Sequence, residues 1–173
     1  MSEYIEFTLF DEKGVERNVK MNKDDENEVY LWKDKWRGQP MKKPYWKKCA
    51  ISKMTNGYYR IVITNKLYYL HRVCYYAHNP EWNIYDFSDS NMIDHKDKDK
   101  QNNHISNLRI ATGAQNQQNR LNTKGYSYHI GHKRFEANIR LNGELIPLGG
   151  FEKEEDARNA YLKAKAKYHT FGI

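Results

Sequence analysis

Cysteine and long apolar runs are what this sequence has least of. Its 173 residues include two cysteines, Cys49 and Cys74, and no Cys-x-x-Cys pair. This argues against a zinc ribbon and against a disulfide-stapled scaffold. No stretch approaches the roughly 20 apolar residues of a membrane helix, and the N-terminus does not resemble a signal peptide. We therefore expect a soluble protein of a reducing cytosol, with no membrane partner and no evident obligate protein partner.

Acidic residues are scarce across the middle of the chain. Residues 32–72 hold 11 Lys/Arg against the single acid Asp34, whereas residues 1–31 hold 9 acids against 4 Lys/Arg. The basic stretch also carries eight aromatic residues, so its cations can meet phosphates while ring faces pack against sugars or bases. A solvated basic face over an aromatic core is the alternative. The net charge of +7 suits a nucleic acid, an anionic membrane or an acidic protein, and does not choose among them.

Hydrophobic periodicity predicts an α+β chain. The expected strands are residues 4–10, 15–19, 58–64, 67–69, 92–95, 108–110, 126–130, 135–141 and 144–148. The expected helices are residues 70–77, 112–122 and 153–168, and Thr112–Gln115 matches a capping box for the second. Between these elements, residues 22–28 suggest a short helix, and Gly38, Pro40 and Pro44 punctuate an irregular basic segment.

A chemically informative group of residues begins at the end of the strand at residues 92–95. The order strand, loop, strand, capped helix brings Asp94 and His95 close to Asn116, in the first turns of the helix. A carboxylate with an amide oxygen makes a hard, oxygen-only site suited to Mg²⁺ (or Mn²⁺) rather than Zn²⁺. His95 has an ordinary pKa near neutrality and can activate a water, while the ion neutralises charge on a phosphate. Taken singly, Asp94 and Asn116 would more often cap turns or helices, but their joint register favours phosphodiester hydrolysis.

Four segments together resemble the HNH nuclease motif, in the form found in phage and intron homing endonucleases. They are Leu70-His71-Arg72-Val73, Asp94-His95, Asn107-Leu108-Arg109 and Thr112–Asn116. The resemblance covers residues 49–122 and implies a ββα-metal (His-Me finger) core. It assigns His95 as general base, Asp94 and Asn116 as metal ligands, and Asn107 as the residue that orients the histidine through its loop. Asn116 replaces the final histidine of the motif, which is a further reason to expect no zinc, and the family chemistry implies a 5′-phosphate and a 3′-hydroxyl as products.

The segment at residues 124–173 resembles the DNA-binding domain of plant ethylene-response (APETALA-type) factors, a domain that also occurs fused to phage HNH nucleases. The matching residues are Lys124–Tyr126, Phe135–Arg140, Leu148–Phe151, Glu155–Ala157 and Ala160-Tyr161. The resemblance implies a small three-stranded antiparallel sheet, packed by one helix, that lies in the major groove. Tyr and Ser stand in its first strand where plant members are richer in Arg, so no sequence preference is transferred. A small αβ domain that contacts the nuclease instead of DNA is the alternative.

Candidate DNA contacts lie in both parts, and those of the C-terminal part are implied by the APETALA-type resemblance. They are Arg60, His71, Arg72, Arg109, Asn119 and Arg120 in the nuclease part, and Tyr128, His132, Lys133, Arg134, Asn138 and Arg140 in the C-terminal part. Packing is the alternative for His71, and a solvated helix face is the alternative for Asn119 and Arg120.

Together these patterns predict three parts: an N-terminal extension (1–48), a nuclease domain (49–122) and a DNA-binding domain (124–173). The predicted function is metal-dependent hydrolysis of phosphodiester bonds in double-stranded DNA by a phage or mobile-element homing endonuclease, located in the host cytosol if phage-encoded. A catalytically inactive, sequence-specific DNA-binding regulator is the alternative. An RNA-binding protein would rest on charge and aromatics alone.

Overall fold

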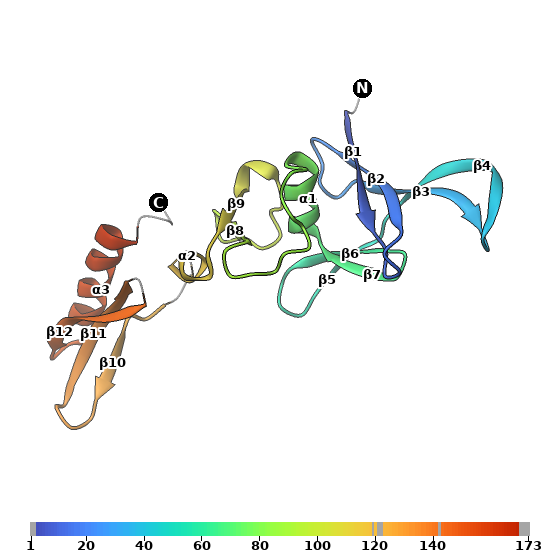
Figure 1. Cartoon of the computed structure of the whole chain (residues 1–173). Helices are drawn as coiled ribbons and strands as arrows, with labels where there is room; N and C mark the ends of the chain where they lie inside the picture. The colour runs from blue at the N-terminus through green and yellow to red at the C-terminus, as the bar shows by residue number, and fades with distance from the viewer. Residues whose placement is uncertain (1–2, 119, 121–122, 142, 170–173) are drawn as a thin grey trace. The chain divides into compact units, whose positions relative to one another are not determined.

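The computed structural model describes residues 3–118, 120, 123–141 and 143–169 (Figure 1). The chain divides into two compact units, residues 1–110 and residues 111–173, and each is described by itself. Both units mix strands with helices, so the predicted α+β class is confirmed. Among the described residues, no helix is long and apolar enough to cross a membrane.

The first unit opens with a four-stranded antiparallel sheet in the order β1-β2-β3-β4. Its first strands, β1 (Tyr4–Phe10) and β2 (Glu16–Asn22), were predicted and are confirmed. Asp11 fixes the turn between them, because its Oδ1 accepts hydrogen bonds from two backbone N–H groups and its Oδ2 lies 2.7 Å from the guanidinium of Arg17. Alternate residues of the sheet are buried, which supplies one wall of the core: Leu9, Val19, Met21, Val29 and Leu31.

The stretch after β2 corrects the sequence analysis. Instead of a short helix and an irregular segment, the chain forms β3 (Val29–Trp36) and β4 (Gln39–Lys48), a hairpin that extends beyond the other strands of its sheet (Figure 1). Arg37 and Gly38 join the strands with φ values of 49° and 83°, as a two-residue turn of the type that matches strand twist. The prolines of β4 are tolerated because β4 is an edge strand. The prediction of an irregular segment from Gly38, Pro40 and Pro44 was therefore wrong.

A three-stranded sheet and one helix complete the core of the first unit. The strands are β5 (Ile51–Lys53), β6 (Tyr59–Ile63) and β7 (Lys66–Tyr69), and the helix is α1 (Leu70–His78). The helix buries Leu70, Val73, Cys74 and Ala77, the positions that its spacing predicted. Asn79 ends the helix, since its backbone and side-chain N–H groups both bond to the carbonyl of Tyr75 at 3.0 Å.

Two short antiparallel strands carry the polar motif. They are β8 (Met92–His95) and β9 (Leu108–Ala111), and a polar loop with a 3₁₀ turn at Ile105–Asn107 joins them. Both strands lie where the sequence predicted them, and the pairing sets the end of β8 beside β9.

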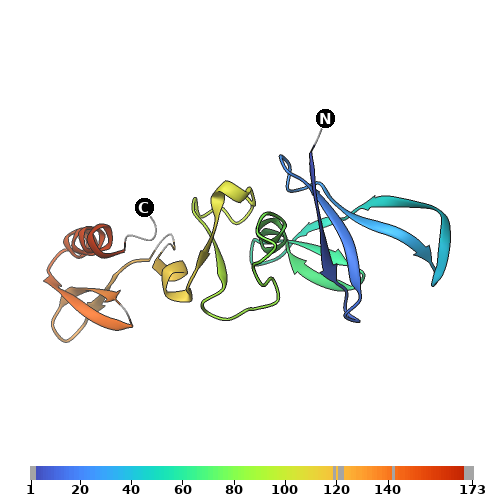
Figure 2. The same cartoon turned by 45° about the horizontal axis from the view of Figure 1, so that its top comes forward.

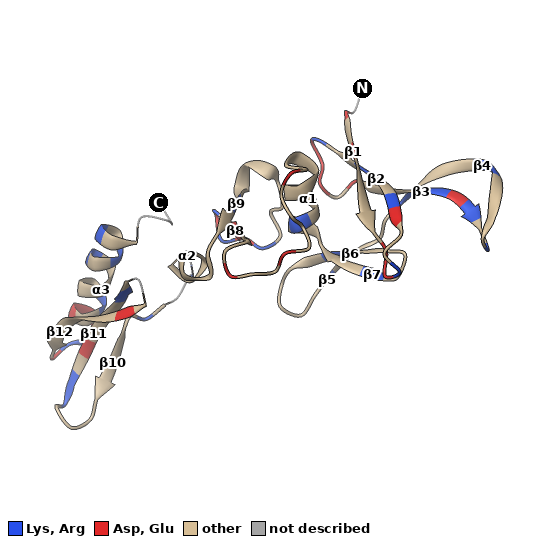
Figure 3. Ribbon diagram, in the orientation of Figure 1, with Lys and Arg blue, Asp and Glu red and all other residues tan. Residues whose placement is uncertain are grey.

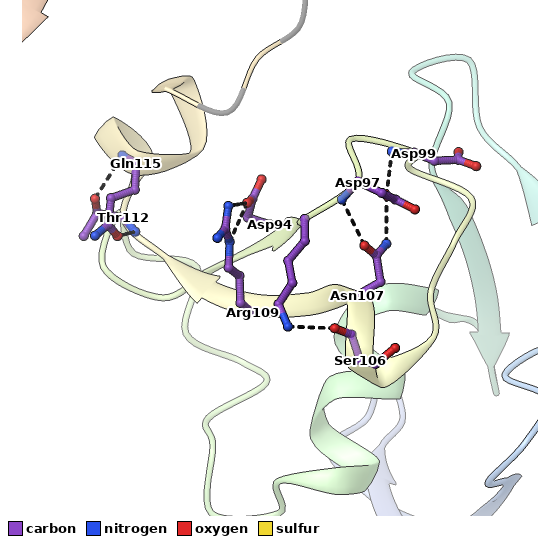
Figure 4. A network of polar contacts seen from close by, with 9 residues as sticks. Asp94, Asp97, Asp99, Ser106, Asn107, Arg109, Thr112 and Gln115 are labelled. Carbon is purple, nitrogen blue, oxygen red and sulfur yellow. Dashed lines mark hydrogen bonds and ion pairs between the residues drawn. The ribbon is translucent and has the colours of Figure 1, made fainter. Parts of the chain in front are cut away.

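The second unit begins at α2 (Gly113–Gln118). Its capping box is confirmed: Gln115 N–H donates to Thr112 Oγ1 at 3.2 Å, and Thr112 N–H donates to Gln115 Oε1 at 2.8 Å (Figure 4). The helix was predicted to reach residue 122, but α2 ends at Gln118 and Arg120 is not helical. Asn119 and residues 121–122 lie outside the described residues.

The rest of the second unit is an antiparallel sheet covered by one helix. The strands are β10 (Tyr126–His129), β11 (Arg134–Leu141) and β12 (Glu144–Phe151), and α3 (Glu154–Tyr168) lies along one face of their sheet (Figure 2). Ile139 packs with Tyr161 and Ala164 in the core. Gly125, at φ 75°, leads into β10 so close to the ring of Tyr161 that a Cβ would stand 2.0 Å from it. Glycine is therefore required at this position by both conformation and space.

Candidate active site

Asp94 and His95 end β8 and are both buried, with 4% of each residue exposed. The neighbouring strand β9 carries Arg109, whose side chain lies beside Asp94. Arg109 Nε and Arg109 Nη2 are each 2.9 Å from Asp94 Oδ2 (Figure 4). The guanidinium balances the charge of the buried carboxylate. Arg109, predicted to contact DNA, is thus held against the predicted metal ligand.

The tautomer of His95 follows from its partner. His95 Nε2 lies 3.2 Å from Oδ1 of Asn103, which is 1% exposed. The amide of Asn103 is oriented because its Nδ2 donates to the carbonyl of Gln101 at 3.2 Å. An amide oxygen only accepts hydrogen bonds, so Nε2 carries the proton and Nδ1 keeps the lone pair of the neutral ring. The sequence analysis did not foresee this role for Asn103.

Burial governs the electrostatics of the two central histidines. It lowers the pKa of His95 below the ordinary value, against smaller opposing effects of Asn103, Asp97 and Asp94. Burial, and then the nearby His95, lower the pKa of His71 to about 3. The two ring centroids are 5.3 Å apart, and Tyr58 lies 5.0 Å from His71. Both imidazoles are therefore neutral at pH 7, and His95 is in the form that accepts a proton.

Asn107 ties the polar loop together. Its Oδ1 accepts the backbone N–H of Asp97 at 3.0 Å, and its Nδ2 donates to Asp97 Oδ1 at 2.9 Å (Figure 4). The same Nδ2 donates to the carbonyl of Asn102 at 2.8 Å. The backbone of Lys96 adds a bond to the Asn107 carbonyl at 2.9 Å. These bonds join the start and the end of the loop directly after His95.

The donor chemistry of this region fits a hard divalent cation. Asp94 offers a carboxylate that is buried beside His95, and thiolates are absent because Cys49 and Cys74 lie in the core or at its edge. Oxygen donors of this kind suit Mg²⁺ or Mn²⁺. The first unit thus brings together Asp94, His95, Asn107 and Arg109. Asn116 lies on α2 in the second unit, where its backbone N–H bonds to the Thr112 carbonyl at 2.9 Å.

The structure buries two of the predicted DNA contacts, which both lie on α1. Arg72 is 5% exposed, and its guanidinium donates to the carbonyls of Ile84, Asp86 and Asn91. It anchors the loop after α1 and does not face solvent. His71 is 8% exposed and packs against His95 and Tyr58. A helix face that borders the core buries even charged residues when carbonyls can satisfy them.

The remaining predicted contacts lie at or near the surface of their units. Arg60 is half-buried on β6 and donates to Ser52 Oγ at 3.0 Å. In the second unit Asn138 is half-buried, and the other described candidates are exposed: Arg120, Tyr128, His132, Lys133, Arg134 and Arg140. Ala137 and Ile139 are buried beneath α3, which leaves Asn138 and Arg140 on the opposite face of β11. Asn119 is outside the described residues.

The comparisons with known proteins agree with this geometry. The profile of a family described as HNH endonuclease matches residues 68–118, from β7 to the end of α2. No curated protein and no solved structure matches the chain. The chain therefore carries an HNH endonuclease domain, whose family hydrolyses phosphodiester bonds in nucleic acid and generally uses a divalent metal. The C-terminal sheet and helix receive no family assignment.

Proposed function

We propose that this protein is a metal-dependent endonuclease that hydrolyses phosphodiester bonds in double-stranded DNA. The observation that carries the proposal is the buried Asp94-His95 pair at the end of β8, with His95 neutral and its Nε2 bonded to Asn103. In this proposal Asp94 and Asn116 hold Mg²⁺ (or Mn²⁺), as their motif positions imply. A bound ion of this class would neutralise charge on the phosphate and on the departing oxygen.

The protein residues then have separate tasks. His95 accepts a proton from the attacking water at Nδ1, because Nε2 already carries one. Asn107 positions the loop that follows His95. Arg109 balances the charge of Asp94 in the free protein, and in this proposal its guanidinium contacts the scissile phosphate.

The second unit supplies DNA contacts in this proposal. Its support is the resemblance of residues 124–173 to APETALA-type domains, and the sheet face opposite the buried Ala137 and Ile139, on which the exposed Arg134 and Arg140 lie. Lys133 stands in the β10–β11 turn beside these residues.

Cleavage of plasmid DNA tests the nuclease directly. Supercoiled plasmid is incubated with wild type and with His95→Ala, each with Mg²⁺, Mn²⁺ and EDTA. Metal-dependent nicking or linearisation by wild type alone is expected, with DNA binding kept by the variant. Full cleavage by His95→Ala would remove this mechanism. Tight DNA binding without cleavage, on DNA that contains the natural target, would favour the inactive regulator instead.

A homing role is proposed from the same resemblance. A homing nuclease cuts an allele that lacks its own gene and spares the allele interrupted by it. The test is cleavage of these two DNA fragments, prepared from the source genome and from a relative without the insertion. Equal cleavage of both would remove the homing role and leave the nuclease intact.

A further inference from the structure

Three metal-ligand side chains gather at the β10–β11 turn, outside the nuclease motif. His129 ends β10, His132 stands in the turn and Glu136 lies on β11, with one donor atom of each within 4.8 Å of the others. His132 Nδ1 is 2.9 Å from Glu136 Oε1, and the backbone N–H of His132 donates to His129 Nδ1 at 3.2 Å. No motif in the sequence marks this trio as a site.

The histidine rings adopt an arrangement that a cation would stabilise. They stack with centroids 4.2 Å apart and planes 17° apart. His129 Nδ1 accepts the backbone N–H of His132, so this nitrogen presents a lone pair. Glu136 contributes a carboxylate to the same spot, and the hydrogen bond from His132 lowers its pKa. The turn thus offers two nitrogen donors and one ionised oxygen donor.

We propose that His129, His132 and Glu136 form a second metal site, for a borderline transition-metal ion such as Zn²⁺. Two imidazoles and a carboxylate are ligands that Zn²⁺ accepts, and three protein ligands leave a fourth position for water or a phosphate oxygen. Mg²⁺ is disfavoured here because it prefers oxygen ligands. This site is distinct from the oxygen-donor site at Asp94, for which zinc is not expected.

The trio needs only a small adjustment to close on an ion. Ligands of a tetrahedral ion with bonds of about 2.0–2.1 Å stand about 3.3 Å apart. The donors of the trio span up to 4.8 Å, so the side chains must move together by about 1.5 Å. The side chain of His132 is 56% exposed and that of Glu136 is 35% exposed, so little packing opposes this movement.

Metal binding would change the charge of the sheet face that carries Asn138 and Arg140. Glu136 is the acidic residue of β11, shown in red in Figure 3. A divalent ion would add positive charge beside Glu136 on this face. If the sheet contacts DNA, as the proposed function holds, the ion would strengthen that contact and order the turn.

The test is Zn²⁺ titration of the metal-stripped full chain by calorimetry, in an Asp94→Ala background that removes the predicted nuclease ligand. One equivalent is expected to bind, and His132→Ala is expected to weaken it by about 100-fold or more, by analogy with losses at supporting residues of metal sites. His104→Ala, which removes an exposed histidine of the first unit, is the matched control and should bind as before. His129→Ala should repeat the loss.

Two outcomes would overturn the site. One is no stoichiometric binding by a chain whose melting curve shows it folded, and the other is equal binding by the His132→Ala and His104→Ala variants. The visible absorption of bound Co²⁺ gives an independent readout of the ligand set. Neither measurement involves DNA cleavage, so the metal site is tested independently of the nuclease activity.

A second inference concerns the β3–β4 hairpin and rests on the proposed function. Residues 32–48 hold seven Lys/Arg and one acid, Asp34. Beyond Val29 and Leu31 the hairpin has no buried residues, and Trp36 and Tyr45 are 69% and 49% exposed. Trp32 and Trp46 pack together at 5.1 Å and stiffen the two strands across from each other. A stiff, basic arm with exposed rings has the chemistry that complements a DNA backbone.

We infer that this hairpin, defined as residues 32–48, binds the phosphate backbone of duplex DNA. Salt dependence of binding tests it, because each phosphate contact contributes about 0.9 to the slope of log K against log salt. In a His95→Ala background without metal, Lys42→Ala/Lys43→Ala is expected to lower that slope by about 2. Lys163→Ala/Lys167→Ala on α3 removes the same charge and should not lower it. Equal slopes for the two double variants would overturn the inference, whether or not the wild type cleaves DNA.

Discussion

Replacing Asn107 with Ala should loosen the loop behind His95 and separate activity from stability. The substitution removes three side-chain hydrogen bonds, to the backbone and carboxylate of Asp97 and to the carbonyl of Asn102. Each hydrogen bond contributes about 0.5–1.5 kcal/mol, and water can replace part of what is lost. The free energy of unfolding should therefore fall by about 2 kcal/mol. For a unit of about 110 residues this lowers the melting temperature by about 8 °C.

Activity should fall much more than this loss of stability explains. Asn107 closes the loop that begins one residue after His95, and a shift of about 1 Å in a catalytic group costs about 100-fold in rate. The assay is the initial rate of plasmid nicking at 20 °C or so, well below both melting transitions, with DNA affinity measured separately.

Val19→Ala is the matched control for this prediction. Val19 is fully buried in β2, and loss of its two methyl groups costs about 2 kcal/mol including the cavity. It is expected to melt like Asn107→Ala but to cleave like wild type at the low temperature. If the two variants lost activity equally, Asn107 would be a stability residue alone and the orienting role would be wrong.

Three further predictions concern other parts of the chain. Burial lowers the pKa of His95 and a bound cation would lower it further, so cleavage should lose activity on acidification only below pH 6.5, measured as a rate profile at saturating metal. Arg72→Leu should destabilise the first unit by about 3 kcal/mol, because three backbone carbonyls lose a charged donor, and a melting curve close to wild type would contradict the structural role. Gly125→Ala should unfold the second unit selectively, as followed by amide exchange of β10–β12, because its Cβ would enter the ring of Tyr161; unchanged protection there would contradict this packing.

Local patterns in the sequence determined much of this protein. The strands β8 and β9 were predicted as short strands on either side of the polar loop, α1 from apolar spacing, and α2 from the Thr112–Gln115 capping box. Each of these signals acts over a few residues, through side-chain period or a hydrogen bond to the nearby backbone, so it can be read without the fold. The ordered segments of the HNH motif were likewise visible as residue types at fixed places in these elements.

Tertiary structure alone decided which of these residues face solvent and which meet each other. Arg72 became an internal anchor because distant carbonyls of Ile84 and Asn91 satisfy it, and His71 became a neutral neighbour of His95 because the core closes over both. The β3–β4 hairpin formed in spite of Pro40 and Pro44, since an edge strand needs fewer backbone donors. The bond from Asn103 that sets the tautomer of His95, and the gathering of His129, His132 and Glu136, depend on loop geometry that no periodicity encodes.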